Sequence, residues 1–376
     1  MNKTLPRWAD FVLIPAINAL LAFFVAGLVV LFIGEDPLKA MRIMIAGSLG
    51  SDYGIGYTLF YTTSFIFTGL AVAVAFHASI FNIGGEGQAG VAGIGVALVC
   101  LTVDQTHWIL ALPLAVIAAA LFGAAWASVP AYLQAKRGSH IVITTIMFNY
   151  IAAALLIYVL NELLKVPGEM APETRRFAEG AHIPRLDQMA GWLGLDLART
   201  PANISFFLAL IACFGVWVLI WRTRLGYEIR AFGHSEKAAV YAGISPVRIT
   251  MIAMLVSGAL AGMMAINTVM GELQRLNLDN VQGAGFVGIA VALMGRSHPI
   301  GVILAALLFG VLYQGGAELA FEIPSIPSQM ILTIQALVIL FTGSLENMVR
   351  FPVERFFLAL NRASERRTTG AQEAAE

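Results

Sequence analysis

Residues 107–129 read HWILALPLAVIAAALFGAAWASV, a stretch of 23 residues that contains no Asp, Glu, Lys or Arg. A helix needs about 20 apolar residues to cross a hydrocarbon core of about 30 Å. This segment is therefore long and apolar enough to span a membrane as a single helix, and it decides which class of fold we expect.

The composition of the whole chain points the same way. Of its 376 residues, 59% are apolar and 12% are charged, and the mean hydropathy is +0.79. A soluble domain is about 45–50% apolar and about 25% charged. The apolar excess excludes a soluble enzyme and a disordered chain. Because Lys and Arg (23) only balance Asp and Glu (23), nucleic-acid binding is excluded as well.

Ten apolar segments of spanning length or close to it follow one another along the chain, at residues 11–33, 57–80, 86–103, 107–129, 141–160, 203–221, 248–269, 284–295, 299–320 and 328–346. The first is longer than the apolar core of a signal peptide, about 7–15 residues, so we expect it to be retained. We predict an all-α integral membrane protein with ten transmembrane helices in residues 1–346 and a tail at 347–376.

The distribution of positive charge predicts the orientation. An even number of crossings puts both ends on one side, and with both ends inside, the inner segments carry 15 Lys and Arg against eight outside. Both termini and the tail are therefore predicted to be cytoplasmic. The difference in positive charge between the two sides weakens if segment 86–103 or 284–295 re-enters the membrane instead of crossing it. With both ends inside, residues 222–247 lie inside as well. Residues 161–202, with six acids, five bases and four prolines, lie outside as a solvated connector or a docking surface.

The third predicted span of each half is short and rich in glycine. FNIGGEGQAGVAGIG occupies 81–95 and VQGAGFVGIAVALMG occupies 281–295. Five spans precede the outer loop and five follow it, so a repeat would have to be inverted. Paired interrupted segments are typical of a central substrate path. Residue identity between the halves is slight, so an inverted 5+5 repeat and two unrelated halves both stay open.

Glu86 stands among three glycines, Gly84, Gly85 and Gly87. A carboxylate costs at least about 2.5 kcal/mol at the centre of a bilayer, so it should face a cavity or the interface. Either this is a glycine turn at the cytoplasmic surface, where Glu86 is wetted or caps the next helix, or it is a gate. The candidate path and gate residues are Asn82, Gly84, Gly85, Glu86, Gln88 and Asn149. Other polar residues in the spans fit simple hydrogen bonds between helices: His77, Asn267, Gln314 and Gln335.

No motif in the chain supports chemistry of its own. The GxGxxG at Gly283, Gly285 and Gly288 follows no predicted strand, and we interpret it as close helix contact. The GxxxG at Gly258 and Gly262 predicts a packing face. Walker A, HExxH, CxxC and nucleophile-elbow patterns do not occur, and both cysteines, Cys100 and Cys213, lie in apolar runs. We therefore predict no catalytic residue, no metal, no disulfide and no ATP hydrolysis by this chain alone.

The loop that the orientation places inside carries a recognisable spacing. KAAVYAG at 237–243 resembles the Glu-Ala-Ala-x-x-x-Gly coupling loop of ABC importer permeases. Lys237 stands where that motif has its acid, so the contacts of that acid are not carried over. Further strings strengthen the resemblance: TGLAVAVAFHASIFNIGGEGQ (68–88), TTIMFNYIA (144–152), GYEIRAFGHSEKAAVYAGI (226–244), SGALAGM (257–263) and GIAVALMGRSHPIG (288–301).

Together these strings resemble the permease subunits of the branched-chain amino acid and ribose transporter group, nearest to the nucleoside branch served by basic-membrane-type lipoproteins. The resemblance covers about residues 58–346. It implies a type II-like ABC importer permease in the bacterial inner membrane that moves a nucleoside or nucleobase by alternating access. It also implies a second permease, commonly a different chain, ATPase subunits that bind ATP and Mg, and an external substrate-binding lipoprotein.

The same resemblance assigns the coupling loop. We expect a short polar helix around 235–242, with Ala238 and Ala239 letting it seat against an ATPase and Gly243 ending it. Arg230, Gly233 and His234 would position or flank this contact. The alternative is an ordinary connector.

Three other readings of the chain have to be weighed. The solute of the same importer is a sugar or a branched-chain amino acid, or the chain is an ion-driven secondary transporter coupled through Glu86, Glu318 or Glu322. A membrane-embedded enzyme is disfavoured because the residues form no catalytic cluster. Five phenylalanines fit either stacking on a base or ordinary packing: Phe60, Phe65, Phe76, Phe81 and Phe148.

Overall fold

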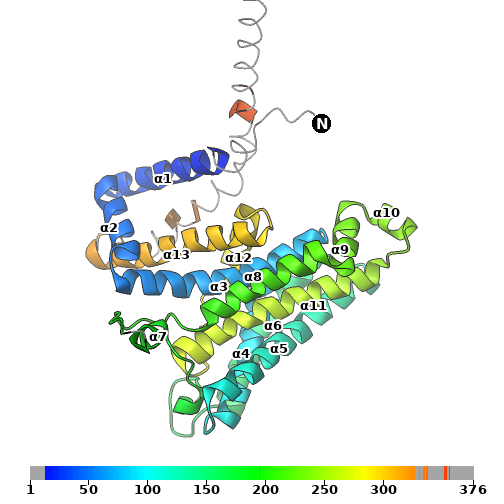
Figure 1. Ribbon diagram of the computed structural model, residues 1–376, viewed down its shortest axis with the longest axis horizontal. Helices are drawn as coiled ribbons and strands as arrows, with labels where there is room; N and C mark the ends of the chain where they lie inside the picture. Colours follow the sequence, from blue (N-terminus) through cyan, green and yellow to red (C-terminus); the bar gives the residue numbers. More distant parts are fainter. Residues whose placement is uncertain are drawn as a thin grey trace, which may run out of the picture. The chain divides into compact units, whose positions relative to one another are not determined.

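The computed structural model describes residues 13–192 and 194–326 and, beyond them, residues 330, 333, 334, 336, 337, 351–353 and 355. Within these ranges the chain is helical, and its one extended pairing is an isolated bridge between Arg185 and Asn203 (Figure 1). The predicted all-α class is confirmed. The chain forms two compact units, one of residues 1–44 and 316–376 and the other of residues 45–315.

Seven helices of the described part are long and apolar enough to cross a membrane, and each overlaps a predicted span. They cover Asp52–His77 (α3), Gly85–Val103 (α4), Trp108–Arg137 (α5), Ile141–Leu163 (α6 continued by a π-turn), Ser205–Arg222 (α8), Pro246–Leu273 (α11 continued by a π-turn) and Pro299–Glu322 (α13). The predicted span at 11–33 forms α1 (Ile14–Ile33) within the described residues. The predicted span at 328–346 and the tail at 347–376 lie almost wholly outside them.

The two glycine-rich segments differ in length. Segment 86–103 becomes α4, a continuous helix of 19 residues. Segment 284–295 becomes α12 (Ala284–Met294), whose 11 residues measure only about 16 Å. Segment 274–283, which consists mostly of turns and bends, therefore has to provide the rest of any crossing at α12.

The end of α5 was predicted too early. The apolar run stops at Val129, but the helix passes through Pro130 and continues to Arg137, where Gly138 ends it with a φ of +70°. Polar residues extend the helix beyond the length that hydropathy can detect, because the backbone needs only its own hydrogen bonds to continue. The glycine then supplies the left-handed conformation that closes the last turn.

Helix α11 is the centre of the larger unit and packs against α3, α4 and α5. Gly258 and Gly262 face α5 so closely that a Cβ on either would overlap the carbonyl oxygen of Gly123 or Ala119. The predicted GxxxG packing face is confirmed, since only glycine lets the two backbones approach to this distance.

The 161–202 segment, which contains a 3-10 turn (Glu179–Ala181) and α7 (Leu186–Trp192), is partly docked. The amide of Thr174 donates to Leu276 O (3.0 Å), and the amide of Phe177 donates to Gln274 O (2.8 Å). Phe177, Ala181 and Ile183 are buried. A fully solvated connector is therefore wrong for residues 174–183, because their apolar side chains are removed from water.

An ion pair fastens the docked part. Arg175 donates to the carboxylate of Asp104, which also accepts from the amide of Ala178 at 3.1 Å. The Asp104 side chain is only 2% exposed. The hydrogen bond from Arg175, above all, holds the pKa of Asp104 below its ordinary value, so the carboxylate stays charged and the pair stays formed at neutral pH.

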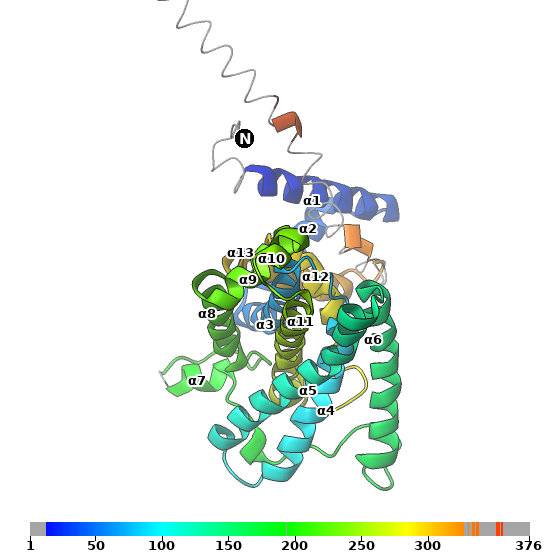
Figure 2. The same cartoon turned by 90° about the vertical axis from the view of Figure 1, so that its right-hand side faces the viewer.

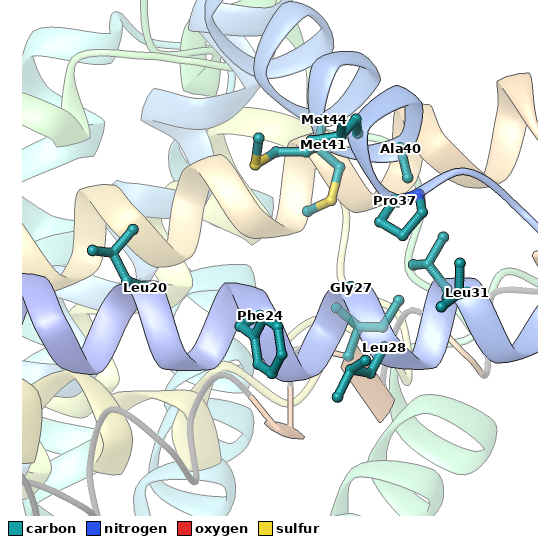
Figure 3. Close-up of a pocket in the computed structure, with 12 residues that line it drawn as sticks. Leu20, Phe24, Gly27, Leu28, Leu31, Pro37, Ala40, Met41 and Met44 are labelled. Atoms are coloured by element: carbon teal, nitrogen blue, oxygen red, sulfur yellow. The ribbon is translucent and has the colours of Figure 1, made fainter.

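The smaller unit contains an apolar pocket of about 340 Å³ between α1 and the start of α2 (Pro37–Leu49). Figure 3 shows Phe24 and Leu28 of α1 on one side and Met41 and Met44 of α2 on the other. Gly34, with a φ of +95°, makes the turn that brings the two helices together. The lining is apolar, as expected for helices that face lipid or one another.

Candidate functional site

The N-termini of α4 and α12 meet inside the larger unit. A Cβ on Gly285 would overlap the amide nitrogen of Glu86, and a Cβ on Gly85 would lie 3.4 Å from Gly285 O. From this junction the two helices run in different directions. Helix α4 ends beside Asp104, which accepts a hydrogen bond from Ala178. Helix α12 ends just before Ser297, which contacts His77. The two segments that the sequence paired are thus in contact.

Glu86 closes this junction. Its Oε1 accepts from the amide of Gly283 and its Oε2 from the amide of Gly285, both at 2.9 Å. The carboxylate therefore caps α12 while it stands in the first turn of α4, at the positive ends of two helix dipoles. Glu86 is half-buried and caps a helix, as the first of the two readings allowed. Its role as a gate stays a prediction.

Asn82, Gly84 and Gln88 build the turn that leads into α4. Asn82 donates to Gln88 Oε1 (3.0 Å) and to Ser257 Oγ (2.9 Å), and its own Oδ1 accepts from the amide of Gly84 (2.9 Å). Ser257 in turn donates to Ala71 O (2.6 Å). All of these side chains are buried. They fasten the turn to α3 and α11, and their role in a path stays a prediction.

Asn149 of α6 fastens the other side of the same turn. Its Oδ1 accepts from the amide of Gly87 (2.9 Å), and its Nδ2 donates to Ile83 O (3.0 Å). Asn149 and Glu86 line a cavity of about 100 Å³ between α4, α6 and segment 278–282. Asn280 lines it as well. The sequence analysis missed Asn280 because it falls between two predicted spans, in a polar run (NLDN) typical of a turn.

Residues 222–247, the predicted coupling loop, contain two short helices, α9 (Arg224–His234) and α10 (Glu236–Tyr241). The predicted short helix is confirmed in α10. Ser235 caps its first turn by accepting from the amide of Ala238 (3.3 Å), and Gly243 follows its end with a φ of +80°. Ala239 is buried within its own chain, whereas Ala238 and Tyr241 are exposed. Of the two predicted alanines, only Ala238 is free to meet a partner.

Helix α9 contacts the turn before α4 and is linked through His77 to the turn after α12. Ser79, before α4, donates to Gly233 O at 2.7 Å, and Gly233 packs on the carbonyl of His77. The His77 ring is 3.0 Å from Ser297 O, in the turn after α12. Trp221 places its ring 5.1 Å from that of His77 and 5.0 Å from that of His298. Figures 1 and 2 show α9 and α10 together at one end of the unit and α7 at the other.

The other predicted residues lie elsewhere. Arg230 is half-buried in α9 and His234 is exposed at its end. Asn267 accepts from Asn203 and Ser205 and donates to Phe60 O and Ser64 Oγ. Gln314 donates to Gly47 O (3.5 Å), and Gln335 lies outside the described residues. Glu318 is half-buried and Glu322 exposed in α13.

The phenylalanines weighed above lie in packed contacts. Phe60 and Phe65 are buried in the core, Phe76 packs against Phe81, and Phe148 packs against Trp126. Among the described residues no three His, Cys, Asp or Glu side chains come together to hold a metal. Both cysteines, Cys100 and Cys213, are free and buried.

Seven apolar helices of spanning length in the described part of the chain indicate a multi-pass membrane protein. Residues 54–343 match the family described as branched-chain amino acid transport system / permease component. The match covers well over half of the chain, so this protein belongs to that family. It is the permease subunit of an ABC importer, as the resemblance predicted, and the ion-driven alternative is disfavoured.

Three relatives match over nearly their whole length. The guanosine ABC transporter permease protein NupP of Bacillus subtilis is 34% identical over 88% of this chain and 93% of its own. The glucose ABC transporter permease protein TsgB13 of Haloferax volcanii is 32% identical over 94% and 92%. The nucleoside ABC transporter permease protein NupB of Lactococcus lactis is 32% identical over 91% and 92%.

Each of these three organisms has a second relative at lower identity, which bears on a partner permease. The guanosine ABC transporter permease protein NupQ of Bacillus subtilis is 24% identical over 67% of this chain. The nucleoside ABC transporter permease protein NupC of Lactococcus lactis is 27% identical over 71%. No solved structure matches the chain significantly.

Proposed function

We propose that this permease imports a nucleoside or nucleobase and is driven from the α10 end by a separate ATPase that binds ATP and Mg. The observation that carries the proposal is the position of α9. It contacts the turn before α4 through Ser79, and through His77 it is linked to the turn after α12 at Ser297. A push on α10 therefore reaches both helices that meet at Glu86.

The mechanism follows from this geometry. Closure of an ATPase dimer presses on the exposed face of α10, formed by Ala238, Val240 and Tyr241. Helix α9 carries the displacement to residues 78–84 and 295–298. Because α4 and α12 point away from each other at the Glu86 junction, a shift of either changes the cavity between α4 and α6. Alternating access then consists of making and breaking the contacts of Glu86 with α12.

The partners follow from the same proposal. The relatives NupP and NupQ, and NupB and NupC, are pairs of permeases in single organisms, which supports a second, related permease beside this chain. An external lipoprotein would deliver solute to the end that carries α7. In the bacterial inner membrane the excess of Lys and Arg then puts the α10 end and both termini in the cytoplasm.

A sugar is the second candidate solute. The identity to TsgB13, a glucose permease protein, is close to that of NupP. Two of the three relatives, NupP and NupB, are named for guanosine and for nucleosides, which supports the nucleoside as the first candidate.

Substitution of Gly243 tests the coupling. Gly243→Val puts a β-branched residue at a φ of +80°, which unwinds the end of α10. We expect the assembled importer in vesicles to lose more than nine-tenths of its ATP-dependent nucleoside uptake while the chain still inserts. Gly168→Val is the matched control, because Gly168 also has a positive φ (+90°) and, like Gly243, no atom within 4 Å of an added Cβ, but it lies in the 161–202 segment. Full uptake by Gly243→Val, or equal loss in both variants, would remove the coupling role.

A further inference from the structure

A short arm at the end of the larger unit that carries α7 exposes large apolar side chains. This α7 arm consists of α7 (Leu186–Trp192) and of residues 194–199, which follow it. Trp192 is 69% exposed, Leu195 58% and Leu197 41%. Contact of such surface with water is unfavourable, and exposed apolar patches mark places where a protein meets a membrane or another protein.

Main-chain hydrogen bonds fix the start of the α7 arm to the start of α8. The amide of Leu186 donates to Ala202 O at 2.8 Å, and the amide of Ile204 donates to Pro184 O at 3.1 Å. The isolated bridge described above lies between these two bonds. In Figure 2, α7 lies beside this end of α8. The arm is therefore held at the first turn of α8.

The length of α8 places this turn at the boundary of the membrane. Its 18 residues measure about 27 Å, close to the hydrocarbon core of about 30 Å, so its ends lie near the edges of the core. Phe207 and Ile211 of α8 are 45% and 65% exposed, as expected of side chains that face lipid. Helix α7 has seven residues and measures about 10 Å. The whole arm therefore stays in or close to the headgroup region, which is about 5–7 Å thick on each side.

The charge beside the α7 arm complements a lipid phosphate. A pocket of about 330 Å³ has nine lining residues in the described part of the chain, which include Arg176, Arg185 and Arg199 but only one acid, Glu272. Arg199 is exposed and belongs to the arm itself. A guanidinium group binds a phosphate through paired hydrogen bonds, and Trp is enriched at the level of the headgroups. A lipid surface therefore fits both the charge and the apolar side chains of the arm.

We infer that the α7 arm is an interfacial anchor. It inserts Trp192, Leu195 and Leu197 into the headgroup region of the leaflet at the start of α8, and Arg199 pairs with a lipid phosphate. Asp196, which is exposed between the two leucines, stays in contact with the water of that region. Lipid is favoured over a protein partner because the arm is held at the depth of the headgroups, where lipid is always present. The inference goes beyond the proposed transport and does not depend on the solute.

A fluorescent label tests the depth of the α7 arm. The full-length permease carries nitrobenzoxadiazole on Leu195→Cys and is reconstituted in vesicles of phosphatidylcholine and phosphatidylglycerol; the two native cysteines are buried. We expect dithionite in the water to reduce this label severalfold more slowly than a label on Met170→Cys, and lipids with a nitroxide near the headgroup to quench it. Met170 is the matched control, because it is apolar and 95% exposed in the same 161–202 segment but outside the arm.

Two results would overturn the anchor. One is an equal rate of reduction at the two positions without quenching by the nitroxide lipids. The other is a label on Leu195→Cys that dithionite reaches freely in the vesicles and that becomes protected only when the external lipoprotein is added, because the surface would then be covered by a protein.

A second comparison isolates the charge. In the labelled chain, protection from dithionite should be stronger in vesicles with phosphatidylglycerol than in vesicles of phosphatidylcholine alone. Arg199→Gln should abolish this difference, whereas Arg222→Gln should keep it, since Arg222 is an exposed arginine at the other end of α8. Loss of the difference in both variants, or in neither, would contradict the pairing of Arg199 with a lipid phosphate.

Discussion

Helices α4 and α12 start at the same point in the larger unit, but their second residues differ. In α4 this residue is Glu86 and in α12 it is Gly285. The carboxylate of Glu86 caps α12, and Gly285 has no side chain because the backbone of Glu86 occupies its place. The single carboxylate of Glu86 therefore interacts with the N-termini of both α4 and α12. A second acid would add like-charge repulsion, and a second glycine would leave the amides of α12 without their cap.

The largest effect on stability and uptake should come from adding a side chain at Gly285. Gly285→Ala forces a methyl group into the amide nitrogen of Glu86, and overpacking of this kind costs about 1–3 kcal/mol. We expect a lower melting temperature of the purified permease and loss of uptake. Gly215→Ala, in α8 with no atom within 4 Å of the added methyl, should change neither. If Gly285→Ala behaves like its control, the two helix ends do not meet as described.

Removing only the charge should have a smaller effect. Glu86→Gln keeps one acceptor for α12 but loses the interaction of a carboxylate with two helix dipoles, so uptake should fall about tenfold with little change in membrane level. Asp52→Asn is the control, because Asp52 also stands in the first turn of a helix, α3, where it is exposed. Unchanged uptake in Glu86→Gln would reduce Glu86 to a structural cap.

The smallest effect should be at the far end of α4, where Asp104 holds the docked part of segment 161–202. Asp104→Asn should raise the rate of proteolysis in residues 161–173 severalfold at neutral pH, while uptake falls only slightly. Asp187→Asn is the control, since Asp187 pairs with Arg185 two residues away. Equal proteolysis of both variants would show that the Asp104 ion pair does not fasten the segment.

The same ion pair gives a pH dependence of known sign. The pKa of Asp104 is lowered in the folded chain, so its contribution to stability is fully present above the ordinary pKa of Asp and is lost as pH falls through the lower, folded-state value. The wild-type segment should stay protected through the range in which ordinary Asp side chains gain protons, and it should be released only below it.

Hydropathy and spacing predicted much of this molecule. Apolar runs located the apolar helices, and the spacing around Ala238 and Gly243 located the short helix α10, because both signals are local. The contact between Glu86 and Gly283 could not be predicted, since it joins residues 197 positions apart. Nor could the burial of Asn280, because a polar residue in a turn reads as solvated until the fold buries it.

The central claim is that displacement of α10 changes the cavity beside the Glu86 junction, and a distance measurement tests it directly. Spin labels on Ala153→Cys and Gln282→Cys, both exposed positions at the cavity, report the separation of α6 from the segment before α12, and the two native cysteines are buried. In the complete importer we predict that ATP shifts this distance and that Gly243→Val abolishes the shift. The same distance distribution with and without ATP would contradict the account.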